Sequence, residues 1–517
     1  MPFQKGSPCR ETSKGKLPYH KTTSVIMFLA GQKLLSLSIV FITVIVFRVA
    51  TCSEQCQSNF GTLNCNGQTR NINTFPEEPT LQGYATLLVT FTNISSLQNG
   101  LVILPPLPQL ETLVLSSNGI LVLNDSLVEN NQQIKSFHLQ YNALSSVPIK
   151  VLENLPNLTY LDLSYNNILT IPENAFHTNH KLGILFVKGN NLNQVHPDAL
   201  NGVFSLKSIV LSNNILDRFS FELFQRVPEL TKLIGIYLDD SRITELSNIS
   251  VEVNSCQTLS LTGNLLQSLK GFTLSGFTGL KLLFVDRNQI SVIDRFVFGF
   301  ETHNLTSLLL NGNNLHRVPV SFLRQLPRLV GLSLAENKLT QLPNDAFKNN
   351  INLKTINLRN NQIHTVHGLS FIGTQNLRFV DLTAYNLSSL PEQLFDVMDP
   401  FVLDIRFNNW TCNCNLFNYL TWSFSGGIRP TLTVCVDPRY GNQSTTVSFP
   451  FHIFCESKIT TVTSFDYDGH TVGSTSSGAL FSERVSLIVF VTFVVLILMF
   501  LVCTAHFITC LSRNDSA

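Results

Sequence analysis

Hydrophobic residues recur along this chain in a unit of about 24 residues. One unit carries apolar side chains at Leu158, Leu161, Leu163 and Ile168, with polar Asn166 shortly before the last of them. The alternation around Leu161 and Leu163 predicts a short strand whose leucines point inward while the residues beside them point outward. A single unit cannot bury this apolar side, so neighbouring units must stack and pair their strands in parallel.

The repeated unit predicts one long array in place of several compact domains. A parallel sheet on one side and bulkier return segments on the other curve such a stack, so we expect an α/β solenoid shaped like a horseshoe, with the sheet on its concave face. Return segments such as 171–176 and 318–323 are expected to form short helical turns or extended pieces. With a degenerate unit at each end, the array should span residues 86–411. The full units open at Leu110, Ile134, Leu158, Leu182, Leu206, Leu233, Cys256, Leu280, Leu305, Leu329, Leu353 and Leu377.

An asparagine recurs where the chain leaves most of these strands. Its amide carries both donors and an acceptor, so we expect it to turn inward and satisfy backbone groups of its own turn and the next one. Ser241 and Tyr385 replace it in two units, and the unit with Ser241 also follows the widest spacing. We therefore expect a bulge or irregular curvature at residues 230–245. The asparagines are Asn118, Asn142, Asn166, Asn190, Asn214, Asn264, Asn288, Asn313, Asn337, Asn361 and Asn408.

Composition narrows the class of protein. Apolar residues make up 44% of the chain and charged residues 13%, which is typical of a protein with membrane segments. The net charge of +1 provides no field that would attract nucleic acid, so we expect no nucleic-acid partner. Cysteines cluster before and after the array, which indicates disulfide caps and an oxidising compartment. Sequons for N-glycosylation indicate the same compartment, at Asn93, Asn124, Asn157, Asn248, Asn304, Asn386, Asn409 and Asn442.

The N-terminal residues 1–51 have the pattern of a targeting segment. Basic residues precede the apolar run 34–47, which is too short for a spanning helix and therefore predicts a cleaved signal peptide. A start at Met27 would leave a signal peptide of ordinary length, whereas a start at Met1 leaves a long basic region. Both starts stay open, and N-terminal sequencing of the mature protein would test the cleavage.

The C-terminal residues predict a membrane anchor. Residues 456–484 are rich in Ser, Thr and Gly, which suits a solvated stalk. Residues 485–509 are long and apolar enough to cross a bilayer, so we expect one transmembrane helix, with the array outside the cell and a short cytoplasmic tail at 510–517. A lipid-anchor signal is the alternative, and the polar residues around Arg513 argue against it. We therefore expect a single-pass type I protein of the plasma membrane.

The unit reads L-x-x-L-x-L-x-x-N-x-L and resembles the repeat of extracellular leucine-rich-repeat proteins over residues 86–455. The array is similar to the ectodomains of Toll-like receptors and of chaoptin- and connectin-like adhesion proteins. The predicted cytoplasmic tail is a handful of residues and carries no Toll/interleukin-receptor domain. The resemblance therefore implies an adhesion molecule or co-receptor in preference to a receptor that signals alone.

The same resemblance extends to the cysteine clusters. Residues 408–416 read N-N-W-T-C-N-C-N-L and are similar to the C-terminal flanking motif of that family, with Asn409 where proline is usual. The resemblance implies a C-terminal cap at residues 412–455 and an N-terminal cap at residues 52–85, and it leaves Cys52 without an assigned partner. The disulfides that it implies are Cys56–Cys65, Cys412–Cys435 and Cys414–Cys455.

The chain shows none of the catalytic motifs that we sought. It lacks a phosphate-binding glycine loop, H-E-x-x-H and G-x-S-x-G, so we expect no enzyme activity, no catalytic residues and no cofactor. A zinc site built from His452 and the cysteines near it is disfavoured, because cysteines at such spacings in a secreted chain usually form disulfides. Cys256 takes an inward leucine position and is expected to be a buried thiol. We therefore expect no metal site.

The outward positions beside the inward leucines are the candidate ligand-binding surface. Exposed aromatic rings with charges at the edge bury large areas at low entropic cost, as protein-binding surfaces do. The alternative is that these are the ordinary scattered apolar residues of a long sheet. The candidate residues on the concave face are Tyr141, Tyr160, Tyr165, Phe186, Tyr237, Asp239, Asp240, Phe284, Asp286 and Arg287.

These features together predict a cell-surface receptor, co-receptor or adhesion molecule that binds a protein ligand in adhesion, guidance or innate immunity. Homodimerisation is left open. The alternative is a secreted or shed non-catalytic subunit of an extracellular enzyme complex. Protease accessibility of the array on intact cells would favour the first hypothesis, and recovery from the medium with an enzymatic partner would favour the second.

Overall fold

The computed structural model describes the repeat array and a few strands on either side of it. All described residues belong to the first of two compact units, Met1–Phe451, and the second unit, His452–Ala517, lies outside them. The predicted signal peptide, stalk, transmembrane helix and tail therefore lie outside the described residues. Within those residues, no helix combines the length and the apolar character needed to span a bilayer. The described residues are 57–59, 62–64, 85–88, 103–225, 227, 232–247, 252–383, 386–394, 402–411, 434–436 and 444–446.

The predicted caps are described only as short strands. An antiparallel hairpin continues into the main sheet before the array, and a small three-stranded sheet follows the array. The disulfide pairings stay predictions. Among the cysteines assigned to them, Cys435 alone lies in a described segment, and only its backbone is described. The hairpin strands are β1 (Gln57–Asn59) and β2 (Thr62–Asn64), and the later strands are β25 (Trp410–Thr411), β26 (Val434–Val436) and β27 (Ser444–Thr446).

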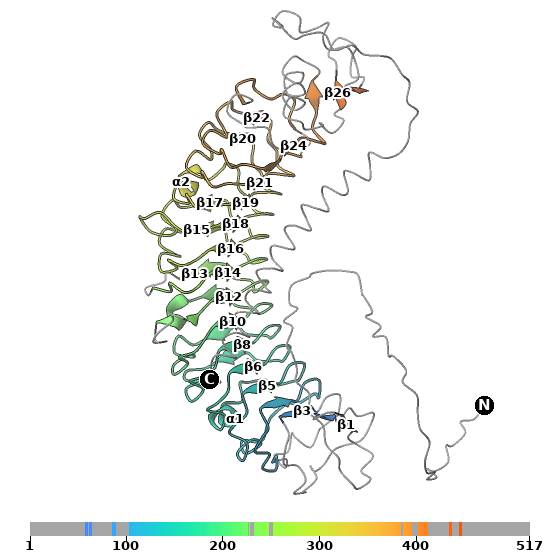
Figure 1. Ribbon diagram of the computed structural model, residues 1–517, viewed down its shortest axis with the longest axis vertical. Helices are drawn as coiled ribbons and strands as arrows, with labels where there is room; N and C mark the ends of the chain where they lie inside the picture. Colours follow the sequence, from blue (N-terminus) through green and yellow to red (C-terminus); the bar gives the residue numbers. More distant parts are fainter. Residues whose placement is uncertain are drawn as a thin grey trace, which may run out of the picture. The chain divides into compact units, whose positions relative to one another are not determined.

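One three-residue strand from each repeat contributes to a single long sheet, which lines the concave side of the array in Figure 1. The strands pair in parallel and in register, so Leu161 of one repeat lies beside Phe137 and Leu185 of its neighbours. In this repeat the central residue points into the core and the two outer residues point away from it, as the alternation predicts. The repeat strands are β3 (Thr86–Leu88), β4 (Thr112–Val114), β5 (Ser136–His138), β6 (Tyr160–Asp162), β8 (Ile184–Phe186), β10 (Ser208–Val210), β12 (Gly235–Tyr237), β14 (Thr258–Ser260), β16 (Leu282–Phe284), β18 (Ser307–Leu309), β19 (Gly331–Ser333), β21 (Thr355–Asn357), β23 (Phe379–Asp381) and β24 (Val402–Asp404).

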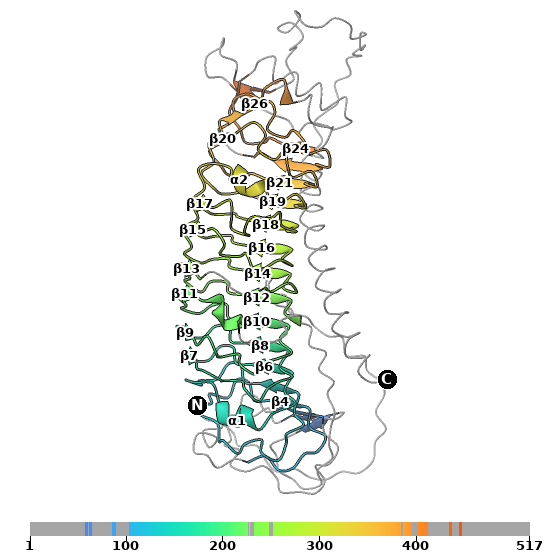
Figure 2. The same ribbon diagram turned by 90° about the vertical axis from the view of Figure 1, so that its left-hand side faces the viewer.

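The return segments on the outer side contain little helix. The predicted α/β class is therefore wrong, and the array is a mainly β solenoid. Among the described residues the α-helices are α1 (Ile149–Glu153) and α2 (Val320–Leu323), each about one turn long, and a 3₁₀-helix, η3, spans Phe221–Phe224. A unit of about 24 residues leaves too little chain for a longer helix once the strand and its turns have formed. Several other returns are extended and pair along the outer side in Figure 2, namely β7 (Thr170–Ile171) with β9 (Gln194–Val195), β11 (Arg218–Phe219) with β13 (Glu245–Leu246), β15 (Ser268–Leu269) with β17 (Val292–Ile293), and β20 (Gln341–Leu342) with β22 (Thr365–Val366).

The core between the two sides is a stack of buried leucines and phenylalanines. Leu161 and Leu163 are fully buried, as are Phe347 and Phe371 on the outer side. The rings of these two phenylalanines stack from adjacent repeats with their centroids 5.5 Å apart. Cys256 is also fully buried, and burial raises the pKa of its thiol to about 12. The prediction of an inward, buried thiol is therefore confirmed.

The asparagine ladder forms as predicted. Asn166 donates from Nδ2 to the carbonyl oxygens of Leu163 in its own turn and of Leu139 in the preceding repeat, each at 3.0 Å. Its Oδ1 accepts the backbone N–H of Leu144, also at 3.0 Å. Each asparagine therefore closes its own turn and ties it to the repeat before. The same pattern recurs at Asn142, Asn190, Asn214, Asn264, Asn288, Asn313, Asn337, Asn361 and Asn408.

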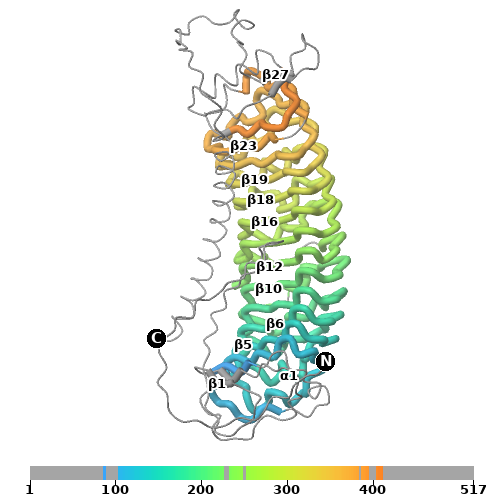
Figure 3. The backbone as a smooth tube through the Cα atoms, turned by 90° about the vertical axis from the view of Figure 1, so that its right-hand side faces the viewer, coloured from blue at the N-terminus to red at the C-terminus, as the bar shows by residue number. Residues whose placement is uncertain are grey.

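Ser241 keeps the ladder continuous but weakens it. Its buried Oγ donates to the carbonyl oxygen of Leu211 at 3.2 Å and accepts the N–H of Asn214 at the long distance of 3.4 Å. The sheet is undisturbed, since β12 pairs residue for residue with β10 and β14, and the coils that carry β10, β12 and β16 follow one another in order in Figure 3. The bulge predicted at residues 230–245 is therefore wrong for the sheet, because the hydroxyl still reaches both turns. Tyr385 lies outside the described residues.

Candidate functional site

The strands of the concave sheet end in turns with a left-handed backbone. The residue just before the ladder asparagine has a positive φ, for example 59° at Tyr141, 55° at Tyr165 and 51° at Arg287. This conformation favours glycine and disfavours other residues by about 1–2 kcal/mol. We call these residues the turn column. Its members are Ser117, Tyr141, Tyr165, Gly189, Asn213, Asp240, Gly263, Arg287, Gly312, Glu336, Asn360 and Phe407.

The candidate residues occupy two rows, and Tyr141 and Tyr165 lie in the turns and not at the outward strand positions predicted for them. On the strands lie Tyr160, Phe186, Tyr237 and Phe284. In the turn column lie Tyr141, Tyr165, Asp240 and Arg287, with Asp239 and Asp286 directly before it. The chain leaves the strand one residue after the inward leucine, so these residues belong to the edge of the face. The structure therefore places a row of turn residues beside the row of strand residues.

Two tyrosines of the turn column stack on each other. The ring centroids of Tyr141 and Tyr165 are 4.6 Å apart and the ring planes lie within 2°. The next residue of the column is Gly189, where an added Cβ would come within 2.6 Å of the Tyr165 ring. The ring of Tyr165 therefore lies flat against the glycine backbone. Tyr141 remains 55% exposed and Tyr165 remains 39% exposed.

A second aromatic group lies on β5, β6 and β8. The ring of Tyr160 contacts Phe186 at a centroid distance of 5.6 Å and His138 at 4.8 Å. His138 is buried, and burial lowers its pKa to about 4, so it is neutral at physiological pH. The sequence prediction misses His138. Its place between the inward residues Phe137 and Leu139 is the signal that identifies it as an outward strand residue.

The other two strand aromatics are separate from this group. Tyr237 covers Gly235 of its own strand, where an added Cβ would lie 2.8 Å from the ring. Burial raises the pKa of Tyr237 to about 12. Ser260 lies between Tyr237 and Phe284 in the register, and no ring contact joins the two within the described array. Tyr237 therefore packs against the sheet and contributes little to the exposed surface.

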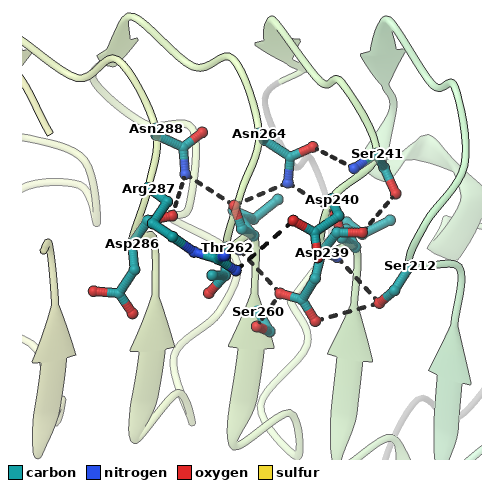
Figure 4. Close-up of polar contacts among 12 residues, drawn as sticks. Ser212, Asp239, Asp240, Ser241, Ser260, Thr262, Asn264, Asp286, Arg287 and Asn288 are labelled. Carbon is teal, nitrogen blue, oxygen red and sulfur yellow. Dashed lines mark hydrogen bonds and ion pairs between the residues drawn. The ribbon is translucent and has the colours of Figure 1, made fainter. Parts of the chain in front are cut away.

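Neutral donors hold the Asp239 carboxylate against the sheet, as Figure 4 shows. Asp239 accepts hydrogen bonds from the N–H of Thr262 at 2.9 Å, from the hydroxyl of Ser212 at 3.3 Å and from the hydroxyl of Ser260. Burial raises the pKa of this carboxyl group, and the three hydrogen bonds oppose the rise. None of these donors is charged, so the negative charge of Asp239 stays at the surface of the concave face.

Asp240 and Arg287 form an ion pair across an intervening repeat in Figure 4. Nη2 of Arg287 lies 3.7 Å from Oδ1 of Asp240. Gly263 is the turn-column residue between them, and an added Cβ at Gly263 would clash with the Asp240 carboxylate. The glycine therefore lets the two side chains meet. Because Arg287 is half exposed and Asp240 is one third exposed, the pair orders this edge of the face without contributing much to stability.

Protonation of the Asp286 carboxyl group should change the free energy of unfolding with pH. Its Oδ1 accepts the N–H of Asn311 at 2.8 Å, and burial raises its pKa to about 6. The folded state therefore binds this proton more tightly than the unfolded state, so stability is lost as the pH rises through 6. Asp286→Asn keeps the acceptor and removes the charge. We expect the variant to be about 1 kcal/mol more stable than the wild type at neutral pH, with the difference shrinking toward pH 4.

Urea unfolding at several pH values between about 4 and 7.5 would measure this difference. The exposed residue Asp217, on the outer side, provides the matched control Asp217→Asn. The control should show no comparable gain at neutral pH. A pH dependence identical in the wild type and in Asp286→Asn would contradict the prediction.

Three further carboxylates face outward from the strands. The sequence prediction misses them because it selects aromatic residues and the charges beside them. Burial raises the pKa of Asp162 and of Asp381. Asp404 pairs with Arg406, whose Nη2 lies 2.6 Å from the carboxylate. Each of the three acids lies between the two inward residues of its strand unit. That repeat position is the sequence signal that identifies them.

The sequons within the described part of the chain lie off the concave strands. Asn157 and Asn304 each precede the opening leucine of a unit. The side chain of Asn157 is engaged, since its Nδ2 donates to the carbonyl oxygen of Gln132 at 3.2 Å and its Oδ1 accepts from Lys181 at 2.8 Å. The exposed sequon asparagines are Asn304, Asn386 and Asn409, whereas Asn124 and Asn157 are half-buried. Asn93, Asn248 and Asn442 lie outside the described residues, and glycosylation of every sequon stays a prediction.

Comparison with known proteins defines the class of this array. The family model for the leucine rich repeat matches residues 108–168, 132–192, 303–350 and 327–387. These matches agree with the parallel solenoid and its asparagine ladder. The chain therefore carries leucine-rich repeats at residues 108–192 and 303–387.

Curated relatives and solved structures share the repeats over part of the chain. U2 small nuclear ribonucleoprotein A' of Candida albicans is 33% identical over 130 residues, which cover 25% of this chain and 55% of that protein. Trophoblast glycoprotein of Macaca fascicularis is 25% identical over 243 residues, which cover 43% of this chain and 53% of that protein. A chain of the Drosophila Toll–Spatzle complex shares the fold with a TM-score of 0.53 at 20% identity, over 64% of this chain and 48% of that chain. This chain thus spans about half the length of these relatives.

Proposed function

We propose that this protein is a single-pass cell-surface protein whose leucine-rich-repeat array binds a protein ligand through its concave face, as an adhesion molecule, co-receptor or receptor. The observation that carries the proposal is the exposed stack of Tyr141 and Tyr165. The left-handed turn disfavours such residues, and neighbouring repeats place Gly189 or Asn213 there. The fold alone does not require the two rings, so we assign them a role at the surface.

The surroundings of the stack suit a protein partner. Tyr160 and Phe186 extend the aromatic area onto the strands, and the Asp240–Arg287 pair adds charge farther along the edge. An aromatic centre with a charged rim is typical of protein–protein interfaces. The described sequons flank the sheet, so glycans on them would leave the strands open. The Toll–Spatzle complex, which shares the fold, is itself a complex between two proteins.

The membrane orientation has a separate test. The apolar run at 485–509 and the targeting pattern at 1–51 support an array outside the cell. We expect protease treatment of intact cells to remove the array from a chain tagged at its C-terminus and to leave a short, membrane-bound tagged fragment. Recovery of the whole array from the medium would favour the shed subunit.

Replacing both stacked tyrosines by asparagine is expected to weaken partner binding at least about tenfold without loss of stability. Asparagine is already present in the turn column, at Asn213 with φ 59° and at Asn360 with φ 55°, so the backbone tolerates it better than tyrosine. The partner would be found by screening the displayed array against a library of secreted and cell-surface proteins. Surface plasmon resonance would then measure its affinity for the wild type and for Tyr141→Asn/Tyr165→Asn.

The matched control removes an exposed ring from the other side of the array. Phe300 is 72% exposed and contacts Phe272 and Phe296 on the outer side. Phe300→Leu should leave the affinity unchanged, and equal thermal unfolding of all variants would show that they fold alike. Unchanged affinity of the tyrosine variant would exclude this end of the concave face. Loss of binding in Phe300→Leu instead would move the site to the outer side.

A further inference from the structure

The residues directly before and after the apolar residue that opens each repeat line one edge of the concave sheet, which we call the opening edge. It lies at the start of the strands, opposite the turn column. The residue after each opening residue donates its backbone N–H to the carbonyl oxygen of its counterpart one repeat earlier, as Arg378 does to Lys354 at 2.8 Å. These bonds run without a gap from Arg378 back to Glu111. Side chains on this edge therefore follow one another at the strand spacing of about 4.8 Å.

Cations gather on the opening edge, whereas carboxylates do not. Among its described residues the one carboxylate is Glu111, which is bound to Lys135 at 2.7 Å. Lys135 apart, none of the cations on this edge forms an ion pair within the described array. The edge therefore has an uncompensated positive charge, although the net charge of the whole chain is only +1. The cations are Lys135, Lys181, Lys207, Lys232, Lys281, Arg328, Lys354 and Arg378.

Three of these cations lie on successive repeats. Arg328, Lys354 and Arg378 lie just before β19, β21 and β23, and all three side chains are exposed. Like charges on neighbouring strands repel each other, so their gathering is unfavourable for the fold alone. The position does not demand a cation either, since other repeats place Thr159 or Thr306 there. We therefore assign the three cations a role at the surface.

We propose that the opening edge at Arg328, Lys354 and Arg378 binds a sulfated polysaccharide. The inference rests on the proposed function only in that it places the array outside the cell, where such chains occur. A linear polysaccharide carries its sulfate groups at intervals along the chain, so one chain lying along the edge can meet cations on successive repeats. The two guanidinium groups donate paired N–H groups to an oxyanion, and the lysine ammonium adds a point charge. The bound chain also relieves the repulsion among the three cations.

Other polyanions fit this part of the edge less well. Single-stranded nucleic acid binds where exposed aromatic rings lie among the cations, because its bases stack on the rings. None of the exposed rings of the described array lies in the three repeats that open at Leu329, Leu353 and Leu377. An acidic protein would need an apolar centre, and beside these cations the described residues expose one large apolar side chain, Ile351. The polysaccharide is therefore the favoured ligand.

Heparin oligosaccharides of defined length serve as the probe, and surface plasmon resonance measures their binding to the immobilised full-length protein. Arg328→Gln/Lys354→Gln/Arg378→Gln should bind heparin at least about tenfold more weakly than the wild type. Its affinity should also depend less steeply on salt, because fewer counterions are released on binding. Heparin from which the sulfate groups have been removed should bind the wild type as weakly as intact heparin binds the variant.

The matched control removes two arginines and one lysine elsewhere on the array. Arg317, Lys338 and Arg359 are exposed and lie off the opening edge. Arg317→Gln/Lys338→Gln/Arg359→Gln should keep the affinity for heparin within about twofold, because salt screens distant charges. Equal thermal unfolding of both triple variants would show that they fold alike. Equal losses of affinity in the two triple variants, or no loss in either, would overturn the inference.

Competition experiments test the class of polyanion. Single-stranded DNA and poly-glutamate, matched to the oligosaccharide in charge, should need at least about tenfold higher concentrations than free heparin to displace bound heparin. Displacement by DNA at equal concentration would indicate a nucleic-acid ligand, and displacement by poly-glutamate would indicate an acidic protein. Either result would overturn the inference, as would equal binding of heparin with and without its sulfate groups.

The outcomes separate this inference from the proposed function. Tyr141→Asn/Tyr165→Asn should bind heparin as the wild type does, because these tyrosines lie on the opposite edge. If that variant loses affinity for the protein partner while heparin binding does not depend on the three cations, the polysaccharide inference alone is wrong. If heparin binding depends on the three cations but protease leaves the array of intact cells uncut, the proposed location at the cell surface is wrong.

Discussion

Replacing Asn166 by alanine is expected to lower the free energy of unfolding by about 3 kcal/mol or more. The side chain makes four buried hydrogen bonds, three from Nδ2 to the carbonyl oxygens of Leu139, Leu163 and Ser164 and one to Oδ1 from the N–H of Leu144. Alanine removes all four and leaves buried backbone groups without these partners, which costs more than the bonds contribute. Urea unfolding followed by circular dichroism would measure the change.

A surface asparagine provides the control for this prediction. Asn352 is exposed, and its Nδ2 donates one hydrogen bond to the carbonyl oxygen of Pro327 at 2.9 Å. Asn352→Ala should cost less than about 1 kcal/mol, because water can replace the lost bond. Equal destabilisation by Asn166→Ala and Asn352→Ala would show that the ladder has no special share in stability.

Replacing Phe347 by alanine is expected to cost about 3–5 kcal/mol. The ring is fully buried on the outer side and stacks on Phe371 at a centroid distance of 5.5 Å. A short return segment has no second layer of side chains that could close the cavity. The cost therefore includes both the lost burial and the empty volume. Thermal and urea unfolding would both report it.

The exposed Phe300 serves again as the control, since the same change there removes a ring that is 72% in solvent. Phe300→Ala should change the free energy of unfolding by less than about 0.5 kcal/mol. In a double-mutant cycle, Phe347→Ala and Phe371→Ala should cost less together than the sum of the single changes, because the two rings share one contact. Strict additivity, or equal effects at Phe347 and Phe300, would argue against a stacked outer core.

The two largest effects concern the buried scaffold of the repeat. Asn166 and Phe347 keep neighbouring coils together, and loss of either affects the adjacent repeats as well, because each repeat contacts mainly its neighbours. The residues assigned to recognition, Tyr141 and Tyr165, lie in a turn whose backbone is held by the same ladder. Stability and the proposed recognition therefore depend on different residues: changes at the ladder should unfold the array, whereas asparagine in the turn column should leave it folded.

Much of the fold follows from the sequence because it depends on a local period. The spacing of Leu161, Leu163 and Asn166 predicts the inward leucines, the parallel strands and the ladder, and the structure shows all three. The return segments are short helical turns and extended pieces, as predicted. The predicted fold class, α/β, is wrong because helices of one turn do not make an α/β protein. The bulge expected in the sheet near Ser241 is absent from β12, because a hydroxyl group can replace much of what an amide does there.

The candidate site was harder to predict, because its contacts join residues from different repeats. Sequence spacing places Tyr141 and Tyr165 at the same position of adjacent repeats. It does not reveal that both have a left-handed backbone conformation or that their rings stack. It also gives no reason to connect Asp240 with Arg287, which meet only because Gly263 lies between them.

By itself, the sequence determined the repeat, the direction of its leucines and the place of each ladder asparagine, since these are set by periodicity within one chain segment. Only the tertiary structure decided which outward residues touch, because that depends on how neighbouring turns stack and on which of them carry glycine. The paired rings of Tyr141 and Tyr165 and the ion pair of Asp240 with Arg287 are products of that stacking.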